Sequence, residues 1–547
     1  MWLLNCETLK CERVLQHTRY VILSHTWGDE AEEISFRDLN DPQITKSKKG
    51  WDKLQNSCKV AKAAGYKYIW NDTCCINKES SSELSEAINS MFKWYESADV
   101  CYAYLEDFDS CDESRSFATS RWFTRGWTLQ ELVAPSDVQF FDKNWVNFGN
   151  RANLKEEISS ITKIQQDILE CSTGRRIRTL LDRIPIARRM AWAALRETTR
   201  TEDRAYSLLG IFDCNMPLIY GEGSRAFHRL QEEIISRTSD LSLFAWRSEA
   251  TTITYGPSKR ETIPPLGCGI LASSPRQFKN SHSIQLICVK GQQPEFTVTN
   301  RGIRVSSKFR GDRDTYLSMG LMCYLNGTER EELHIHLEPL DGHTYGRRSP
   351  HKLFIKPHRT EWDGDVCIRL STKIHSISQH ANPVYLGPNI YIGESLRKLA
   401  RDTRLRVGPR RGNWDKSRHM FLTYELSAFS GFFIFWRPGS KAPISIAFGF
   451  DNDKSFWLLM TTAGVELDTH KAICSEREDR IMSLKHLATT ETPSLNIDFK
   501  DTGGRKLTQT ITISAQQYFS DGIPVYVIGA VEQTMTVSEK EGCCVIL

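Results

Sequence analysis

The apolar positions of residues 1–150 follow two periods in turn. Short apolar runs typical of buried strands lie at 20–25, 68–76, 101–108 and 138–142. Apolar residues spaced three or four positions apart predict amphipathic helices at 51–65, 82–98 and 121–135. Strands and helices therefore alternate. This order predicts a parallel sheet with helices on both faces and with functional loops at the carboxyl ends of the strands.

The pattern changes in the rest of the chain. Residues 151–250 are mostly helical in their periodicity, whereas from 251 to 532 glycine and proline separate short strand-like runs such as EFTVT and ISIAFGF. Residues 533–547 are typical of a flexible tail. We therefore expect a multidomain α/β plus β protein: an α/β domain at 1–150, a helical segment, an antiparallel β-rich domain and a tail.

Composition narrows the class of protein. The chain has 547 residues, 40% of them hydrophobic and 25% charged, which is the mix of a soluble globular protein with several domains. Its best apolar runs, 431–436 and 525–531, are too short to span a bilayer. The net charge is +4, but residues 1–150 hold 17 basic and 23 acidic side chains, a net of −6. We expect no nucleic-acid partner.

Cysteine usage indicates a reducing compartment. Sixteen cysteines in 547 residues are far fewer than in disulfide-stapled secreted domains, and no signal-peptide core follows Leu4. We expect a cytoplasmic protein whose thiols are mostly buried and structural. There is no CxxC pair, and Cys6, Cys11, Cys74 and Cys75 lack zinc-finger spacing, so we expect no metal site.

The last four residues, from Cys544 to Leu547, match the C-a-a-X pattern, in which a terminal leucine favours geranylgeranylation of the cysteine. One lipid seldom anchors a protein stably, and the preceding TVSEKEG holds no polybasic patch. Palmitoylation of Cys543 would supply a second signal. The sequence therefore predicts peripheral attachment to a membrane surface, and a sterically hidden terminus is the alternative.

Two further patterns have ordinary explanations. Gly221, Gly223 and Ala226 have the G-x-G-x-x-A spacing of a dinucleotide loop, but Pro217 interrupts the strand that should precede it. Capping of the following helix explains the glycines as well. The arginine-rich stretch 175–204 is more typical of a solvated helix face than of a phosphate site. We expect no permanently bound cofactor.

Polar residues gather in three segments of the first domain. Ser24 and His25 end the first predicted strand, and Trp27 lies in the loop that follows. Asp72 comes late in the second strand region, after Asn71. The helix at 121–135 adds four more polar or aromatic candidates, Arg121, Trp122, Trp127 and Glu131. In a parallel sheet these groups can converge at one edge.

The same segments carry a family resemblance. YVILSHTWGDE, YIWNDTCCINK and SRWFTRGWTLQEL resemble, in order and spacing, the three characteristic blocks of the fungal heterokaryon-incompatibility (HET) domain. The resemblance covers 1–150, and RTEDRAYSLLGIF and MPLIYGEGSRAFHRLQEEI resemble the helical segment that often follows. The second block departs from the family pattern where Thr73, Cys74 and Cys75 follow Asp72 and where Asn77 and Lys78 follow Ile76. The resemblance implies non-self recognition that ends in programmed cell death, with protein partners and a homo-oligomer as the expected assemblies.

The HET domain is distantly similar to TIR domains, which implies a TIR-like, flavodoxin-like parallel sheet in this chain. Trp127 and Glu131 resemble the helix whose glutamate is catalytic in TIR enzymes that cleave NAD. The resemblance therefore implies Glu131 as the catalytic carboxylate and NAD as substrate, since a carboxylate can stabilise an oxocarbenium-like transition state. Ser24, His25, Asp72 and Arg121 would order the pocket, and Trp27 or Trp127 would stack on a flat ring.

A structural explanation of these residues stands beside the enzymatic one. His25 can be a satisfied histidine at a strand end, the tryptophans core anchors, and Glu131 a helix partner of Arg121 or Arg125. The domain would then be a non-catalytic module that signals by assembly. Release of nicotinamide from NAD by the purified domain separates the two.

Overall fold

The structure is a computed structural model, and its first 249 residues are described apart from 15–17, 113, 115 and 171–173. Residues 251–368 are described apart from 256–258, 264–268, 288–293, 301, 313–315, 329–330, 342–343 and 358–361. Between 389 and 537 the described residues are mainly strands. The chain divides into two compact units, Met1–Ser248 with Gly267–Ser371 and Glu249–Leu266 with Thr372–Leu547. Cys543 and Cys544 lie outside the described residues.

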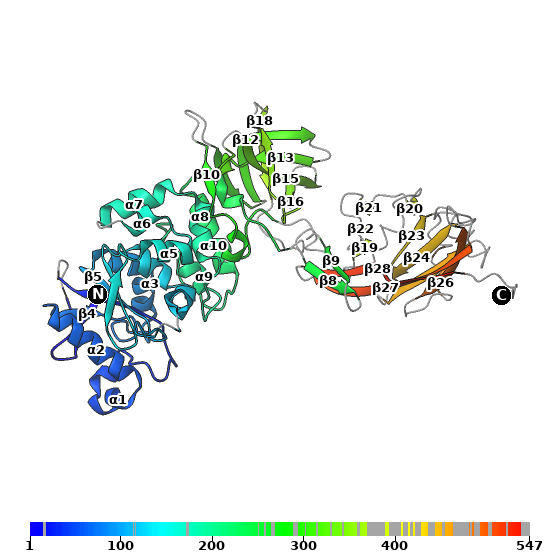
Figure 1. Cartoon of the computed structure of the whole chain (residues 1–547). Coiled ribbons are helices and arrows are strands. Elements are labelled where there is room, and N and C mark those ends of the chain that lie inside the picture. The colour runs from blue at the N-terminus through cyan, green and yellow to red at the C-terminus, as the bar shows by residue number, and fades with distance from the viewer. Residues whose placement is uncertain are drawn as a thin grey trace, which may run out of the picture. The chain divides into compact units, whose positions relative to one another are not determined.

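A seven-stranded sheet, coloured blue to cyan in Figure 1, forms the core of the N-terminal region. Its strands are β1 (Trp2–Asn5), β2 (Cys11–Arg13), β3 (Val21–His25), β4 (Tyr68–Trp70), β5 (Val100–Tyr104), β6 (Val138–Phe141) and β7 (Asn147–Asn150). Their order is β2-β1-β4-β3-β5-β6-β7. β4, β3, β5 and β6 are parallel to their neighbours in this group.

The sheet is mixed, which corrects the prediction of a parallel sheet. β1 pairs antiparallel with β2 and β4, and β7 pairs antiparallel with β6. The reason is the length of the connections. Short loops join β1 to β2 and β6 to β7, whereas a parallel pair of strands needs a crossover of a dozen residues or more. Within the parallel group the order reverses between β3 and β5. Ligands of such sheets bind outside the carboxyl ends at this point.

Helices connect the parallel strands. After β3 come α1 (Pro42–Ser47) and α2 (Gly50–Ala63), and after β4 comes α3 (Ser81–Ser97), which begins where the Ser80 hydroxyl accepts from the amide of Glu83. α2 and α3 agree with the predicted spans 51–65 and 82–98 to within two residues, whereas α1 was not predicted. The predicted helix 121–135 is wrong as one helix: a 3₁₀ turn (Arg121–Thr124) and α4 (Thr128–Val133) replace it.

That break has a physical cause in the following helical segment. The amide of Gly126 donates to the carbonyl of Glu197 at 2.8 Å, and the amide of Glu197 donates to the carbonyl of Thr124. This pairing draws the chain out of helical geometry. The predicted strand 68–76 is also shorter than expected, because the carbonyl of Asn71 accepts from the amides of Cys74 and Cys75 and so forms a turn.

Short helices follow the sheet as predicted. They are α5 (Lys155–Thr162), α6 (Gln166–Leu169), α7 (Gly174–Arg183), α8 (Ile186–Ala193), α9 (Asp203–Tyr206) and α10 (Arg225–Ile235). Their apolar faces join the hydrophobic core of the sheet, where Phe92 of α3 lies against the backbone of Gly210. The sheet and the helices are therefore one packed body.

The first unit ends in mainly antiparallel strands, shown in green in Figure 1; the pair β16–β18 is parallel. They are β10 (Ile284–Leu286), β11 (Glu295–Thr299), β12 (Gly302–Asp312), β13 (Tyr316–Gly320), β14 (Cys323–Leu325), β15 (Glu331–Asp341), β16 (Thr344–Arg348), β17 (Phe354–Pro357) and β18 (Trp362–Ile368). β12 pairs with both β13 and β18, which closes β12, β13, β15, β16 and β18 into a ring. Such closure leaves no free strand edge within the ring.

The second unit is also rich in antiparallel strands. It holds β8 (Thr251–Tyr255), β9 (Lys259–Ile263), β19 (Asn389–Ile392), β20 (Arg406–Gly408), β21 (Trp414–Asp415), β22 (Met420–Phe421), β23 (Phe429–Phe435), β24 (Ile444–Phe450), β25 (Phe456–Thr462), β26 (Ser494–Lys500), β27 (Lys506–Ser520) and β28 (Ile523–Val537). β23 and β24 are buried at every position. Among the described residues, no helix is long and apolar enough to cross a membrane.

Candidate active site

At the carboxyl end of β3, three side chains are linked by hydrogen bonds. Ser24 donates to a carboxyl oxygen of Glu131 at 2.5 Å, and the indole of Trp122 donates to the Ser24 hydroxyl at 2.8 Å. Ser24 and Trp122 are fully buried, and Glu131 is 4% exposed. Glu131 reaches this position because α4 packs against β3. The structure therefore brings Ser24 and Glu131 together, 107 residues apart in sequence.

Glu131 is held mainly as a neutral acid. Burial raises its pKa to about 8, and the negative charge of Asp72 acts in the same direction. The hydrogen bonds with Ser24 and Tyr95 and the charge of Arg196 lower its pKa only in part. Tyr95 itself donates to the carbonyl of Leu23 in β3 at 3.0 Å. A carboxyl group in this setting is protonated at neutral pH and can change its charge in the physiological range.

His25 and Asp72 form a second group beside Ser24. Nε2 of His25 lies 3.1 Å from an oxygen of Asn71 and 3.1 Å from an oxygen of Asp72. The His25 side chain is 1% exposed and that of Asp72 is 20% exposed. Nδ1 of His25 is buried and has no hydrogen-bond partner. Asp72 thus joins a buried histidine to the solvent-facing rim of the site.

The rim consists of Trp27 and Lys78. The Trp27 indole donates to the second oxygen of Asp72 at 2.9 Å, and the ammonium of Lys78 lies 3.7 Å from the centre of the Trp27 ring. Burial raises the pKa of Asp72, but the hydrogen bonds with His25 and Trp27 and the charges of His25 and Lys78 together outweigh it, so the pKa falls below its ordinary value. Burial likewise lowers the pKa of Lys78, against the charge of Asp72. An aromatic face, a cation and a carboxylate thus meet at one edge.

The two remaining predicted residues lie apart from Glu131. Arg121 donates to the carbonyl of Trp27 at 2.9 Å and to the hydroxyl of Thr26, so it fixes the loop after β3. The indole of Trp127 faces the carboxylate of Asp203, 3.4 Å away in α9. Trp127 therefore contacts the helical segment, and Trp27 is the predicted tryptophan beside Asp72.

The suggested helix ion pairs of Glu131 are not found in the described part of the chain. Arg121 is engaged at Trp27, and Arg125 donates to the hydroxyl of Thr199. The nearest cationic influence on Glu131 is Arg196, whose guanidinium donates to the Arg125 carbonyl at 2.9 Å and to the Thr128 hydroxyl at 2.8 Å.

Sequence reasoning missed three contributors: Tyr95, Lys78 and Arg196. Tyr95 lies on the buried apolar stripe of α3, a position typical of a core residue, although its hydroxyl also serves the site. Lys78 belongs to the second HET-like block, so its place after Asp72 was a usable signal. Nothing local marks Arg196, because it acts from the helical segment.

The glycine motif at 221–223 is used internally. The amides of Gly221 and Gly223 donate to one carboxylate oxygen of Glu202 at 2.8 and 2.9 Å. These are the groups that would hold a phosphate in a dinucleotide loop, so an anion of the chain itself takes that place. The arginine-rich stretch is also partly internal: Arg178 donates to the carbonyl of Gly210 and buried Arg189 to that of Ile211.

No three His, Cys, Asp or Glu side chains are arranged to hold a metal ion within the part of the chain that the structure describes.

Comparison with known proteins finds family matches over two parts of the chain. The family model of the heterokaryon incompatibility protein (HET) matches residues 20–119, and that of a domain of unknown function (DUF8212) matches residues 225–308. Vegetative incompatibility protein HET-E-1 of Podospora anserina is 46% identical over 224 residues, which are 39% of this chain and 16% of that protein. The chain thus spans a small part of this relative's length. No solved structure matches. Over part of its length, this chain therefore resembles heterokaryon incompatibility proteins, and residues 20–119 match the HET domain.

Proposed function

We propose that this chain acts in heterokaryon (vegetative) incompatibility, as an effector of non-self recognition that promotes programmed cell death. The HET match and the name of the 46% identical relative support the incompatibility role. The HET domain would be the executor, and the remaining regions would sense, regulate or position it. Protein partners and self-association are part of this proposal.

The chemistry proposed for the executor is cleavage of the ribosyl–nicotinamide bond of NAD. The observation that supports this activity is the buried carboxyl group of Glu131. It accepts a hydrogen bond from Ser24 at the point where the strand order reverses. Counted along the chain, the parallel strands lie in the order 2-1-3-4, which is the order of flavodoxin-like sheets and supports a TIR-like fold. Strongly shifted buried acids in such places favour a functional role.

The reaction would use the groups as follows. The bond between the ribose C1 carbon and the ring nitrogen breaks, nicotinamide leaves with the bonding electrons, and water adds to C1 with loss of a proton to solvent. The product is ADP-ribose. The positive charge of bound NAD would favour the ionised form of Glu131, which then stabilises the oxocarbenium-like transition state. Trp27 would stack on a ring of the substrate, and Lys78 would attract its phosphates.

Glu131 is 4% exposed, so substrate reaches it only after the site opens. This observation favours a second candidate function, in which Ser24, Trp122 and Glu131 are a structural network and the HET domain signals by assembly. The buried Ser24 supports this reading as well, since its hydroxyl is already satisfied on both sides.

Nicotinamide release by the purified full chain separates the two functions. Wild type should release nicotinamide from NAD, Glu131→Gln should lower the rate by about two orders of magnitude or more, and Glu96→Gln, a partly exposed glutamate of α3, should leave it unchanged. Equal background rates for wild type and Glu131→Gln, even when the protein is forced to oligomerise, would contradict the enzyme. If Glu131→Gln also still kills fungal cells, the assembly module stands.

Membrane attachment is a separate proposal. It rests on the C-a-a-X sequence at Cys544, with Cys543 as a second lipid site. Cys544→Ser should move the protein from the membrane fraction to the cytosol. Cys543→Ser should weaken the attachment and leave prenylation intact. An unchanged partition of Cys544→Ser would remove the anchor from the proposal.

A further inference from the structure

Several free thiols gather at the edge of the N-terminal sheet. Cys11 begins the edge strand β2, and Cys74 and Cys75 lie in the turn after β4. The Cys11 thiol donates to the carbonyl oxygen of Cys74 at 3.3 Å, and the side chains of Cys74 and Cys75 lower the pKa of Cys11 by hydrogen bonding. Residues 63 apart in sequence are thus in contact through sulfur.

The members of this cluster differ in exposure. Cys74 is fully buried and Cys75 is 3% exposed, whereas Cys11 is half-buried and open to solvent. A neutral Cys11 thiol donates to the Cys74 carbonyl, and an ionised one accepts from the neighbouring thiols, so both states have partners in place. The hydrogen bonds from Cys74 and Cys75 hold the pKa of Cys11 well below its ordinary value. A half-buried thiolate beside a second thiol is the arrangement that oxidants attack.

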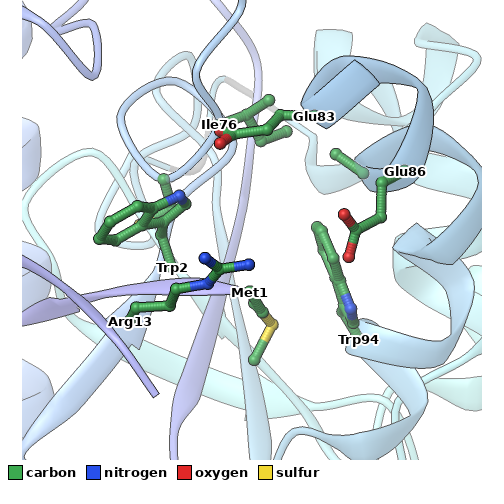
Figure 2. Close-up of a pocket in the computed structure, with 9 residues that line it drawn as sticks. Met1, Trp2, Arg13, Ile76, Glu83, Glu86 and Trp94 are labelled. Atoms are coloured by element: carbon green, nitrogen blue, oxygen red, sulfur yellow. The ribbon is translucent and has the colours of Figure 1, made fainter. Parts of the chain in front are cut away.

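Solvent also reaches the far side of the turn. A pocket of about 40 Å³ is lined by Cys75, Arg13, Glu86 and Trp94, among others. Figure 2 shows the Arg13 guanidinium and the Glu86 carboxylate turned into this space. This volume has room for molecules of the size of water or hydrogen peroxide, since a single water needs roughly 10–15 Å³ on this scale.

We propose that Cys11 and Cys74 are a peroxide-sensitive thiol pair that forms a disulfide. The Cys11 thiolate attacks a hydroperoxide, the O–O bond breaks, and the products are a sulfenic acid and an alcohol or water. The Cys74 thiol then displaces the sulfenic hydroxyl, which leaves as water while the S–S bond forms. Two electrons pass from the two sulfurs to the peroxide. The inference is independent of the chemistry proposed for Glu131.

The disulfide would act on the candidate site through one turn. Asn71 begins this turn, and its amide lies 3.4 Å from the Cys75 sulfur while its side chain contacts His25. Asp72 follows directly and holds both His25 and Trp27. A bond from β2 to Cys74 fixes the residue two positions after Asp72. Oxidation would therefore change how firmly His25 and Trp27 are held.

Peroxide titration of the reduced full chain tests the proposal. After alkylation and tryptic digestion, residues 11–13 should be found joined to residues 68–78, with fragmentation placing the link on Cys74. Cys11 should lose its free thiol at least tenfold faster than the exposed Cys111, which serves as the internal reference. Cys11→Ser should abolish the link, Cys74→Ser should leave a Cys11 sulfenic acid that dimedone traps, and Cys111→Ser should change nothing.

The comparison of Cys11 and Cys111 oxidation rates uses the wild-type protein alone, so it still tests the proposal if a substitution prevents folding. Oxidation of Cys11 no faster than that of Cys111, a link from Cys11 to any other cysteine, or a link formed only in denaturant would overturn the proposal.

Discussion

The Ser24 hydroxyl lies 2.5 Å from the Glu131 carboxyl, and this contact joins the end of β3 to the helix α4. Both groups are buried beneath the edge where His25 and Asp72 meet. The contact gives Glu131 a fixed place but no counter-ion, since within the described residues it forms no salt bridge. The charge state of the Glu131 carboxyl therefore affects both the folding stability of this domain and the proposed NAD cleavage.

Stability should fall as pH rises through the titration of Glu131. Its pKa is about 8 in the folded protein, against an ordinary value of 4.5. The folded state then holds a proton that the unfolded state has already lost, so the stabilisation is complete below pH 4.5 and disappears as pH passes 8. One unit of pKa corresponds to about 1.4 kcal/mol, so a loss of a few kcal/mol is expected.

Urea unfolding of wild type and Glu131→Gln at pH 5.5 and pH 8.5 measures this effect. The variant keeps a neutral side chain of similar shape, so the difference in its unfolding midpoint between the two pH values should be smaller than that of wild type. Parallel shifts of the two proteins would mean that Glu131 is already ionised at pH 5.5.

Ser24→Ala should destabilise the protein by about 2–4 kcal/mol, because it leaves the Trp122 indole and the Glu131 carboxyl buried without their shared partner. Ser57→Ala is the matched control. Ser57 is equally buried, but its hydroxyl only bonds back to the carbonyl of Leu54 in its own helix. Denaturant unfolding should show a clear difference between the two variants, and equal losses would show that the Ser24 contacts contribute nothing specific.

The sequence predicts the elements better than their connections. Periodicity places β3, β6, α2 and α3 to within about two residues, since their buried stripes are local properties of the chain. The breaks at Asn71 and Gly126 could not be predicted, because each depends on hydrogen bonds made once the chain folds back. The antiparallel pairing at the two edges of the sheet also could not be predicted from periodicity. It depends on the short loops that join β1 to β2 and β6 to β7, and the order of strands and helices does not contain this information.

Some residues of the candidate site could likewise be predicted from the sequence, and others could not. Ser24, His25, Asp72 and Glu131 are found at one edge, because a parallel sheet brings the carboxyl ends of its strands together. Trp127 shows the limit of this argument. It lies four residues before Glu131, about one helical turn, but the chain is not helical at Gly126 and its indole faces Asp203 instead.

Gly126→Ala should destabilise the domain and displace Glu131. A methyl group at this position would lie 2.5 Å from the Thr198 side chain, which is too short for that side chain to remain in place, and 3.4 Å from the Ser207 hydroxyl, which is a close but ordinary contact. We expect a loss of about 1–3 kcal/mol from overpacking. Gly28→Ala is the control, since its methyl group would meet Glu33 at an ordinary 3.7 Å. Thermal unfolding compares them, and a neutral Gly126→Ala would mean that residues 197–198 do not press on this turn.

Arg347→Ala should loosen the antiparallel strands of the first unit from its helical segment. The buried Arg347 guanidinium donates to the carbonyls of Phe244 at 3.0 Å and Trp246 at 2.6 Å, and lies 3.9 Å from the centre of the Trp246 ring. Its removal leaves two buried carbonyls unpaired and a cavity, at a cost of about 3–5 kcal/mol. A lysine ammonium cannot donate to both carbonyls as the planar guanidinium does. Arg347→Lys should therefore recover only part of the lost stability.

Hydrogen exchange is the suitable measurement for this change, because it reports the local opening of individual segments of the protein. The amides of residues 241–246 should exchange faster by two orders of magnitude or more in Arg347→Ala, while those of β3 stay protected. Arg348→Ala, at the neighbouring and more exposed position, is the control and should leave this exchange nearly unchanged. Protection that survives Arg347→Ala would show that the apolar packing around Trp246, and not the guanidinium, holds the two regions together.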